Sequence, residues 1–328
     1  MYFEKKHKSS DMGNNKDEYR NFSASEPGVS VFSKGWWLDA VCGKDNWDVV
    51  TIKKNEVIVA ALPFATSRRF IYKGIELPPF TPRLGPWVKY PEKITHVDQL
   101  SFEKDIFTQL INGLPKFDYF SQAFNPAFKN WLPFFWHGFR QMTKYTYIIE
   151  DISDIDLVVT NFSYAKKKNI KKAEKSVKIR FDLPAKEFYE HHKYTLAKQG
   201  RKIVYSFDLF ERMYDAAYKN NSGTTIYAID EQKNIHSALF VIWDDISAYD
   251  LISTIEPDYR GSGSASLLIR EIIKHVSNKT KSFDFEGSMI ENVENSFKQF
   301  GAIQTQYFKI TKFNARILRL VKAWNNTN

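Results

Sequence analysis

The chain contains 328 residues, of which 43% are hydrophobic and 16% aromatic, and its formal net charge is +9. This apolar content excludes an intrinsically disordered chain, and the length predicts about two domains. The positive charge favours anionic partners such as phosphates, nucleic acid or an anionic membrane surface, without choosing among them. A single cysteine, Cys42, excludes an intrachain disulfide and favours a reducing compartment. With neither an apolar signal-peptide region nor a run of about 20 apolar residues, we expect a cytoplasmic protein.

The first third of the sequence predicts a tail, a short helix and a hairpin. Residues 1–27 are polar and lack periodicity, so they are expected to be a disordered tail. Residues 32–41 predict a short helix, in which Trp37 could face a substrate, although a tryptophan there more often packs in the core. Residues 48–64 read as two strands around a polar turn.

The segment Leu77–Trp87 is rich in proline and therefore predicts a long, shaped loop rather than a central strand or helix. A helix over residues 102–114 and strands over 119–124 and 141–149 follow it.

Residues 162–175 predict an amphipathic helix with a strongly basic face. That face carries five lysines: Lys167, Lys168, Lys171, Lys172 and Lys175. Glu174 is the only acidic residue in the segment, so the lysines lack the partners that usually balance such a face. We therefore favour an anion-binding face over a merely solvated one.

Residues 184–197 predict a helix that contains the adjacent histidines His191 and His192. Neighbouring residues of a helix point in different directions, and no zinc-binding motif is present, so no metal is expected. His191 is a candidate to line a substrate pocket; the alternative is a structural histidine. Residues 225–243 then repeat the strand, polar turn and strand of residues 48–64, which suggests two copies of one unit.

The stretch TIEPDYRGSGSASLLIREIIKHV (residues 254–276) predicts a strand end, a Gly/Ser loop and a helix. Such a helix entry attracts phosphates, because its first N–H groups are unpaired and glycines expose the backbone. A P-loop is excluded because no lysine follows Gly263. A dinucleotide fingerprint stays an alternative, with Ser266 in place of its third glycine and Asp284 as the ribose contact. The segment matches, at every position, the R/Q-x-x-G-x-G/A loop of the GNAT acyltransferases: Arg260, Gly261, Ser262, Gly263, Ser264 and Ala265. A loop that binds nothing is the alternative.

Residues 282–288 alternate phenylalanine with acid, so a strand here would place Asp284 and Glu286 on one face. They are candidate acid–base groups, or simply a soluble strand face. A helix over 291–300, a strand over 304–311 containing Tyr307, and a basic amphipathic helix over 314–324 follow. The last helix could touch a membrane surface or pack on its domain.

The lysine helix, the RGSGSA loop and residues 283–302 together resemble the tandem-GNAT proteins related to the peptidoglycan-bridge aminoacyltransferases, the Fem family. The resemblance implies an α/β fold with mixed sheets and two tandem GNAT-like domains separated by a cleft. Residues 28–150 would be a degenerate copy, since Leu77–Trp87 stands in place of its loop. Residues 151–328 would be the copy with an acyl-CoA-type loop.

The resemblance also implies N-acyl transfer from acyl-CoA, a co-substrate rather than a permanently bound cofactor. The acceptor would be an anionic amine, such as a nucleotide sugar or a lipid-linked sugar of the cell envelope. Glu286 would be the base, Asp284 its alternative or an anchor for the acceptor, and Tyr307 the acid that protonates the thiolate. Fem enzymes proper use aminoacyl-tRNA, which is the alternative donor. A basic nucleic-acid-binding protein without catalysis is the rival of another class, although no nucleic-acid-binding motif is evident.

Overall fold

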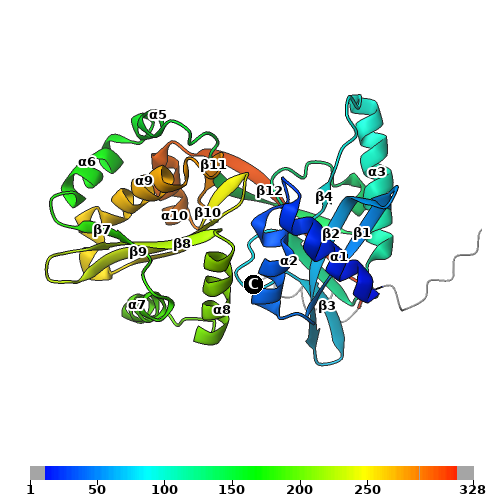
Figure 1. Cartoon of the computed structure of the whole chain (residues 1–328), viewed down its shortest axis with the longest axis horizontal. Coiled ribbons are helices and arrows are strands. Elements are labelled where there is room, and N and C mark those ends of the chain that lie inside the picture. Colours follow the sequence, from blue (N-terminus) through cyan, green and yellow to red (C-terminus); the bar gives the residue numbers. More distant parts are fainter. Residues whose placement is uncertain (1–11, 288, 316–328) are drawn as a thin grey trace, which may run out of the picture. The chain divides into compact units, whose positions relative to one another are not determined.

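The structure is a computed structural model that describes residues 12–287 and 289–315. It divides into two compact units. Unit 1 comprises the described residues up to Thr143 together with those from Phe308 onward, and unit 2 comprises Lys144–Tyr307. Figure 1 shows the elements coloured along the chain.

Unit 1 places two helices before an antiparallel hairpin, and then continues through a third strand, a long helix and a further strand. Its elements are α1 (Met12–Ser25), η1 (Val31–Ser33), α2 (Gly35–Cys42), β1 (Trp47–Lys54), β2 (Val57–Arg69), β3 (Tyr72–Glu76), β4 (Trp87–Val88), α3 (His96–Gly113), β5 (Tyr119–Ala123) and α4 (Leu132–Trp136).

After two leading helices and the additional strand β7, unit 2 follows the same order of main elements, without a counterpart of the two-residue strand β4. Its elements are α5 (Ile155–Thr160), α6 (Tyr164–Ala173), β7 (Lys178–Phe181), α7 (Ala185–Lys198), α8 (Phe207–Lys219), β8 (Gly223–Ile229), β9 (Ile235–Trp243), β10 (Ser247–Ile255), η2 (Pro257–Ser262), α9 (Ser264–Val276), β11 (Ser282–Asp284), α10 (Glu291–Phe297) and η3 (Lys298–Phe300).

The two units share one topology, as the repeated hairpin predicts. In unit 1 the strand order is β1-β2-β3-β5, with β3 and β5 parallel and the other pairs antiparallel. In unit 2 it is β8-β9-β10-β11, with β10 and β11 parallel. In each unit a helix, α3 or α9, connects the two parallel strands, which is the crossover that a parallel pair requires.

Two strands pass from one unit to the other. Strand β6 (Arg140–Ile149) starts in unit 1 and pairs with β11 in unit 2 through Ile148 and Ile149. Strand β12 (Ile303–Phe313) starts in unit 2 and pairs with β5 in unit 1 through residues 309–313. The sequence predicts a single boundary at residue 150, whereas the end of the described chain returns to the first unit.

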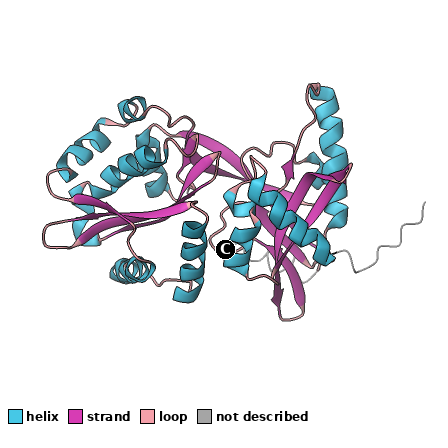
Figure 2. Ribbon diagram, viewed as in Figure 1, coloured by secondary structure: helices cyan, strands magenta, loops and turns pink. Residues whose placement is uncertain are grey.

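Helices cover both faces of the unit 2 sheet (Figure 2). Helix α9 buries Leu268, Ile272 and Val276 against the face that carries Leu239 and Val241 of β9. Phe240 of β9 points to the other face, where its ring contacts Phe188 of α7 and Phe210 of α8. Unit 1 has a separate core in which phenylalanines from α3, β5, α4 and the segments that follow β5 and α4 pack together: Phe107, Phe120, Phe124, Phe128, Phe134 and Phe139.

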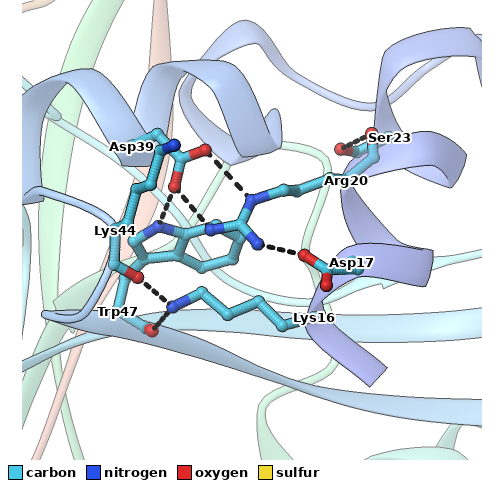
Figure 3. A network of polar contacts seen from close by, with 7 residues as sticks. All are labelled: Lys16, Asp17, Arg20, Ser23, Asp39, Lys44 and Trp47. Atoms are coloured by element: carbon cyan, nitrogen blue, oxygen red, sulfur yellow. Dashed lines mark hydrogen bonds and ion pairs between the residues drawn. The ribbon is translucent and has the colours of Figure 1, made fainter. Parts of the chain in front are cut away.

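The expected disordered tail is wrong for residues 12–25, which form helix α1. Tyr19 of this helix is fully buried, and its hydroxyl donates to the carbonyl oxygen of Ser33 at 2.7 Å. Arg20 donates from Nε and Nη2 to the two carboxylate oxygens of Asp39, at 3.0 and 2.8 Å. Trp47 Nε1 donates to the same carboxylate at 2.9 Å (Figure 3). The helix therefore depends on contacts with α2 and β1, which its own weak periodicity does not indicate.

Candidate functional site

Strands β10 and β11 separate partway along their length. They pair over three residues only, Ser247–Tyr249 against Ser282–Asp284. Strand β11 ends there, whereas β10 continues to Ile255 without it. The pairing of β10 with β9 shifts register between Asp250 and Ile252, at the same level. Such bulges redirect side chains and are common beside active sites, so this opening is our candidate reaction centre.

Asp250 lies at the opening and is only 8% exposed. The hydroxyl of Ser253 donates to its carboxylate, 2.7 Å from each oxygen. Burial raises the pKa of Asp250 to about 6. A carboxyl group with a pKa near neutrality can accept and release protons at physiological pH, as a general base must.

The alternation predicted that Asp284 and Glu286 lie on one strand face, and this is wrong because Glu286 lies beyond the end of the strand. Strand β11 ends at Asp284, which is 2% exposed and accepts hydrogen bonds from the Thr146 hydroxyl and from the backbone N–H of Glu286, the latter at 2.8 Å. Glu286 is half-buried in the left-handed region at φ +59°. Asp284 therefore fixes the turn that presents Glu286, and left-handed backbone in a residue other than glycine is a recurrent feature of functional turns.

Tyr307 lies on β12, the strand after α10, and is half-buried. It belongs to unit 2, as Asp284 and Glu286 do, but it comes from a different strand. Its role as an acid stays a prediction.

The RGSGSA loop forms the end of η2 and the start of α9, as its pattern predicts. Its first half is accessible, because Arg260 and Gly261 are exposed. Its second half is closed, because Ser264 is 1% exposed and its backbone N–H donates to Ser262 Oγ at 3.2 Å. Ser237 also donates to Ser264 Oγ at 2.9 Å. An anion could therefore reach the Arg260–Gly261 end of the loop but not the Ser264 side chain.

The lysine helix lies directly beside this loop. Helix α6 extends over Tyr164–Ala173, and Lys172 Nζ donates to the carbonyl oxygen of Gly261 at 2.5 Å. Lys167 Nζ donates to the Thr160 carbonyl oxygen at 2.7 Å. Lys168 and Lys171 are exposed, and no ion pair joins either to a carboxylate in the described part of the chain. Two features that the sequence presents separately thus form one cationic region.

Lys166 lies outside the basic face that the sequence predicts, and it differs from the other lysines of α6. It is half-buried, its Nζ donates to Ser296 Oγ at 2.9 Å, and Nζ lies 4.2 Å from the centre of the Phe300 ring. Burial lowers the pKa of Lys166 to about 8. Its spacing from Phe162 and Ile170, four residues in each direction, places it on the buried stripe, and this was the signal available in the sequence.

Trp37 does not bind a substrate from the surface, because its side chain is fully buried and its Nε1 donates to Thr81 Oγ1 at 2.9 Å. His191 is half-buried, and its Nε2 has no hydrogen-bond partner among the residues described. Burial lowers the pKa of His191, and the charge of Glu256 opposes that effect. Its substrate role stays a prediction.

The described residues bear on metal binding and on contact with a membrane. No three His, Cys, Asp or Glu side chains gather among them as a metal site would require. The basic helix expected over residues 314–324 lies mostly outside the described residues. Across those same described residues, no helix combines the length and apolar character that crossing a bilayer needs.

Comparison with known proteins finds similarity in structure only. No protein-family model matches the chain, and no curated protein matches its sequence. The crystal structure of FemX aligns with a TM-score of 0.70 at 12% identity, over 97% of this chain and all (100%) of that one. The chain has the Fem-like tandem-GNAT fold. The C-terminal domain of an assigned lysylphosphatidylglycerol synthetase from Agrobacterium fabrum aligns at TM-score 0.54 and 10% identity, over 96% of each chain. A tandem GNAT protein from the clavulanic acid biosynthesis pathway aligns at 0.51 and 8%, over 92% of this chain and 96% of that one.

These similarities confirm the mixed α/β architecture and the tandem-GNAT resemblance expected from the sequence. The deciding feature within the chain is the shared order of helices and strands in the two units, with one parallel strand pair in each. Asp250 is not among the residues predicted from the sequence, because the apolar residues on both sides of it indicate only a strand. A carboxylate inside an apolar strand was the signal that could have identified it.

Proposed function

We propose that the chain is an acyltransferase that forms an amide bond at the point where β10 and β11 separate. The observation that carries this proposal is the opening itself, which has Asp250 on one strand and the Glu286 turn after the other. The RGSGSA helix entry follows β10 directly. The Fem-like tandem-GNAT fold supports transferase chemistry of this class.

In the proposed reaction the amine nitrogen of the acceptor attacks the carbonyl carbon of the donor. A carboxylate accepts the proton that the nitrogen loses, and the bond from the carbonyl carbon to sulfur or oxygen breaks. Glu286 is the proposed base, because Asp284 holds its turn and its side chain is partly accessible. Asp250 borders the same opening and is the second candidate base. Tyr307 would protonate the leaving thiolate.

Acyl-CoA is the proposed donor. Its pyrophosphate would bind at Arg260 and Gly261, the accessible end of the loop, with the exposed lysines of α6 nearby. Arg260 and these lysines would supply the positive charge that phosphate oxygens favour.

Aminoacyl-tRNA is the second proposed donor, and one observation favours it. The second half of the loop is occupied by its own hydrogen bonds and by α6, whereas Lys168 and Lys171 remain exposed. Exposed lysines contact a nucleic-acid backbone without reading its sequence. The acceptor in both cases would be an anionic amine, such as a nucleotide sugar or a lipid-linked sugar.

Incubation with either donor and a panel of amino-sugar nucleotides tests the proposal, with mass spectrometry detecting the amide. We expect an acylated product with one donor class, and a loss of about 100-fold or more in rate for Glu286→Gln, the usual scale for removing a general base. Glu231→Gln, on the exposed turn after β8, is the matched control. Salt-dependent binding of nucleic acid without any acyl transfer would instead support the non-catalytic rival.

A further inference from the structure

The turn between β2 and β3 presents two large apolar side chains to solvent. Phe70 is 95% exposed and Ile71 is 75% exposed. Strand β5 pairs with β3 from Gly74 onward, and Lys73 hydrogen-bonds to Asp118 just before β5, so residues 68–72 extend past the neighbouring strand. Figure 1 shows the end of this hairpin projecting beyond the helices of its unit, below the label of β3. The two side chains therefore contribute nothing to the core of unit 1.

Phe70 is also an unfavourable residue for its backbone position. It is the first residue of a two-residue turn, since Arg69 pairs with Tyr72, and its φ is +55°. Such turns favour glycine or asparagine, because other side chains are strained in the left-handed region. A bulky aromatic residue here lowers local stability, and because its ring is exposed, no burial of apolar surface offsets that loss. A site where a local rule is broken without structural benefit is a candidate for function.

Cationic side chains flank the apolar tip on both strands. Arg68 and Lys73 are exposed, and the Arg69 side chain is 70% exposed although it pairs with Glu76 at 3.1 Å. The whole chain carries a net charge of +9. The tip thus combines apolar side chains that can enter a hydrophobic layer with cations that remain at its surface.

We propose that the Phe70–Ile71 tip inserts into the surface of an anionic membrane. A stable protein partner would need to bury roughly 1,000 Å² or more, which a two-residue tip cannot supply alone. A bilayer interface requires only that the apolar tip enters the acyl boundary while Arg68, Arg69 and Lys73 face anionic headgroups. This site is independent of the reaction centre in unit 2.

Co-sedimentation of the full chain with lipid vesicles tests the proposal. We expect binding to vesicles that contain phosphatidylglycerol, and much weaker binding to vesicles of phosphatidylcholine alone. Phe70→Asn with Ile71→Ser should weaken binding at least about tenfold, since it removes most of the apolar area. Arg68→Gln with Lys73→Gln should weaken it by roughly fivefold for each charge removed. Val204→Asn, which alters a 93% exposed residue of unit 2, is the control and should bind as the original chain does.

Thermal unfolding separates this account from a folding defect. Phe70→Asn should leave the melting temperature unchanged or raise it, because asparagine tolerates the left-handed conformation. The proposal is overturned if the chain binds neither vesicle, or if the Phe70/Ile71 variant binds as well as the original. It is also overturned if that variant instead abolishes self-association measured without lipid, since a second copy would then cover the tip.

Discussion

Gly263 and Asn169 bring the lysine helix against the start of α9. A Cβ atom built on Gly263 would lie 2.2 Å from the carbonyl oxygen of Asn169, and the φ of Gly263 is +85°. Glycine is therefore required here by the close approach of two backbones, whether or not the loop binds a phosphate. Packing does not require glycine at Gly261, because a Cβ atom built there would have no described atom beyond its chain neighbours within 4 Å.

The first prediction follows from this difference. Gly263→Ala should lower the free energy of unfolding by about 2–5 kcal/mol, from left-handed strain and overpacking together. Gly261→Ala should change it by less than about 0.5 kcal/mol, as an exposed substitution does. Chemical denaturation of both variants measures the difference. Equal stabilities would show that α6 does not pack against the loop in this way.

The second prediction concerns the buried carboxyl group of Asp250. Its pKa in the folded chain, about 6, lies above the ordinary value of about 4, so the folded state holds this proton more tightly than the unfolded state does. The cost of burying the charge is fully present above pH 6 and is absent below about pH 4. Asp250→Asn should therefore raise the free energy of unfolding at pH 7 by up to roughly 2–3 kcal/mol, and the gain should vanish near pH 4.

Urea unfolding at several pH values checks this expectation, with Asp215→Asn on the exposed side of α8 as the control. If Asp250 also serves as the base, the acyl-transfer rate of the original chain should fall as the pH drops below about 6, and this fall should be absent in Asp250→Asn. A variant that is less stable than the original at pH 7 would contradict the assigned burial cost.

The third prediction applies the same reasoning to Lys166, with the opposite sign. Its folded pKa, about 8, lies below the ordinary value for lysine, so burial of the charge costs stability below pH 8. That cost should disappear as the pH rises above about 10, where the unfolded chain also loses the proton. Lys166→Met should raise the melting temperature at pH 7 but not at high pH, whereas Lys168→Met at an exposed position should change it little. A pH-independent effect of Lys166→Met would contradict the account.

The fourth prediction concerns the exposed lysines of α6. Lys168→Gln with Lys171→Gln should weaken tRNA binding and reduce the slope of log affinity against log salt by about one for each phosphate that the protein no longer neutralises. Lys186→Gln with Lys202→Gln removes the same charge at other exposed positions of unit 2 and is the matched control. Equal weakening in both double variants would mean that net charge, rather than the α6 face, attracts the nucleic acid.

Much of unit 2 was predictable because its signals are local. The apolar spacing of Leu268, Ile272 and Val276 predicted α9, and the glycines before it predicted the turn. The exchange of β6 and β12 was not predictable, because strand pairing joins residues far apart in the sequence. Helix α1 was not predicted for a similar reason, because it is held by tertiary contacts such as that of Arg20 with Asp39, which its own sequence does not indicate.

The candidate site was predictable only in part. The alternation indicated Glu286 as the base, which stays a prediction. It also put Asp284 on the same strand face, which is wrong because β11 ends at Asp284 and Glu286 lies in the turn that follows. The contact of Lys172 with Gly261, which joins the lysine helix to the loop, depends on packing between α6 and α9 and has no signature in either segment alone.

Titration calorimetry with acyl-CoA tests most directly the claim that a donor binds at the start of α9. Gly261→Asp adds a negative charge at the accessible end of the loop without a steric clash, and Asn278→Asp adds one just beyond the other end of the helix. The account predicts that the original chain and Asn278→Asp bind acyl-CoA, and that Gly261→Asp binds at least about tenfold more weakly, the scale of one charge-assisted contact. Equal binding by all three proteins, or no binding by any of them, would contradict the claim.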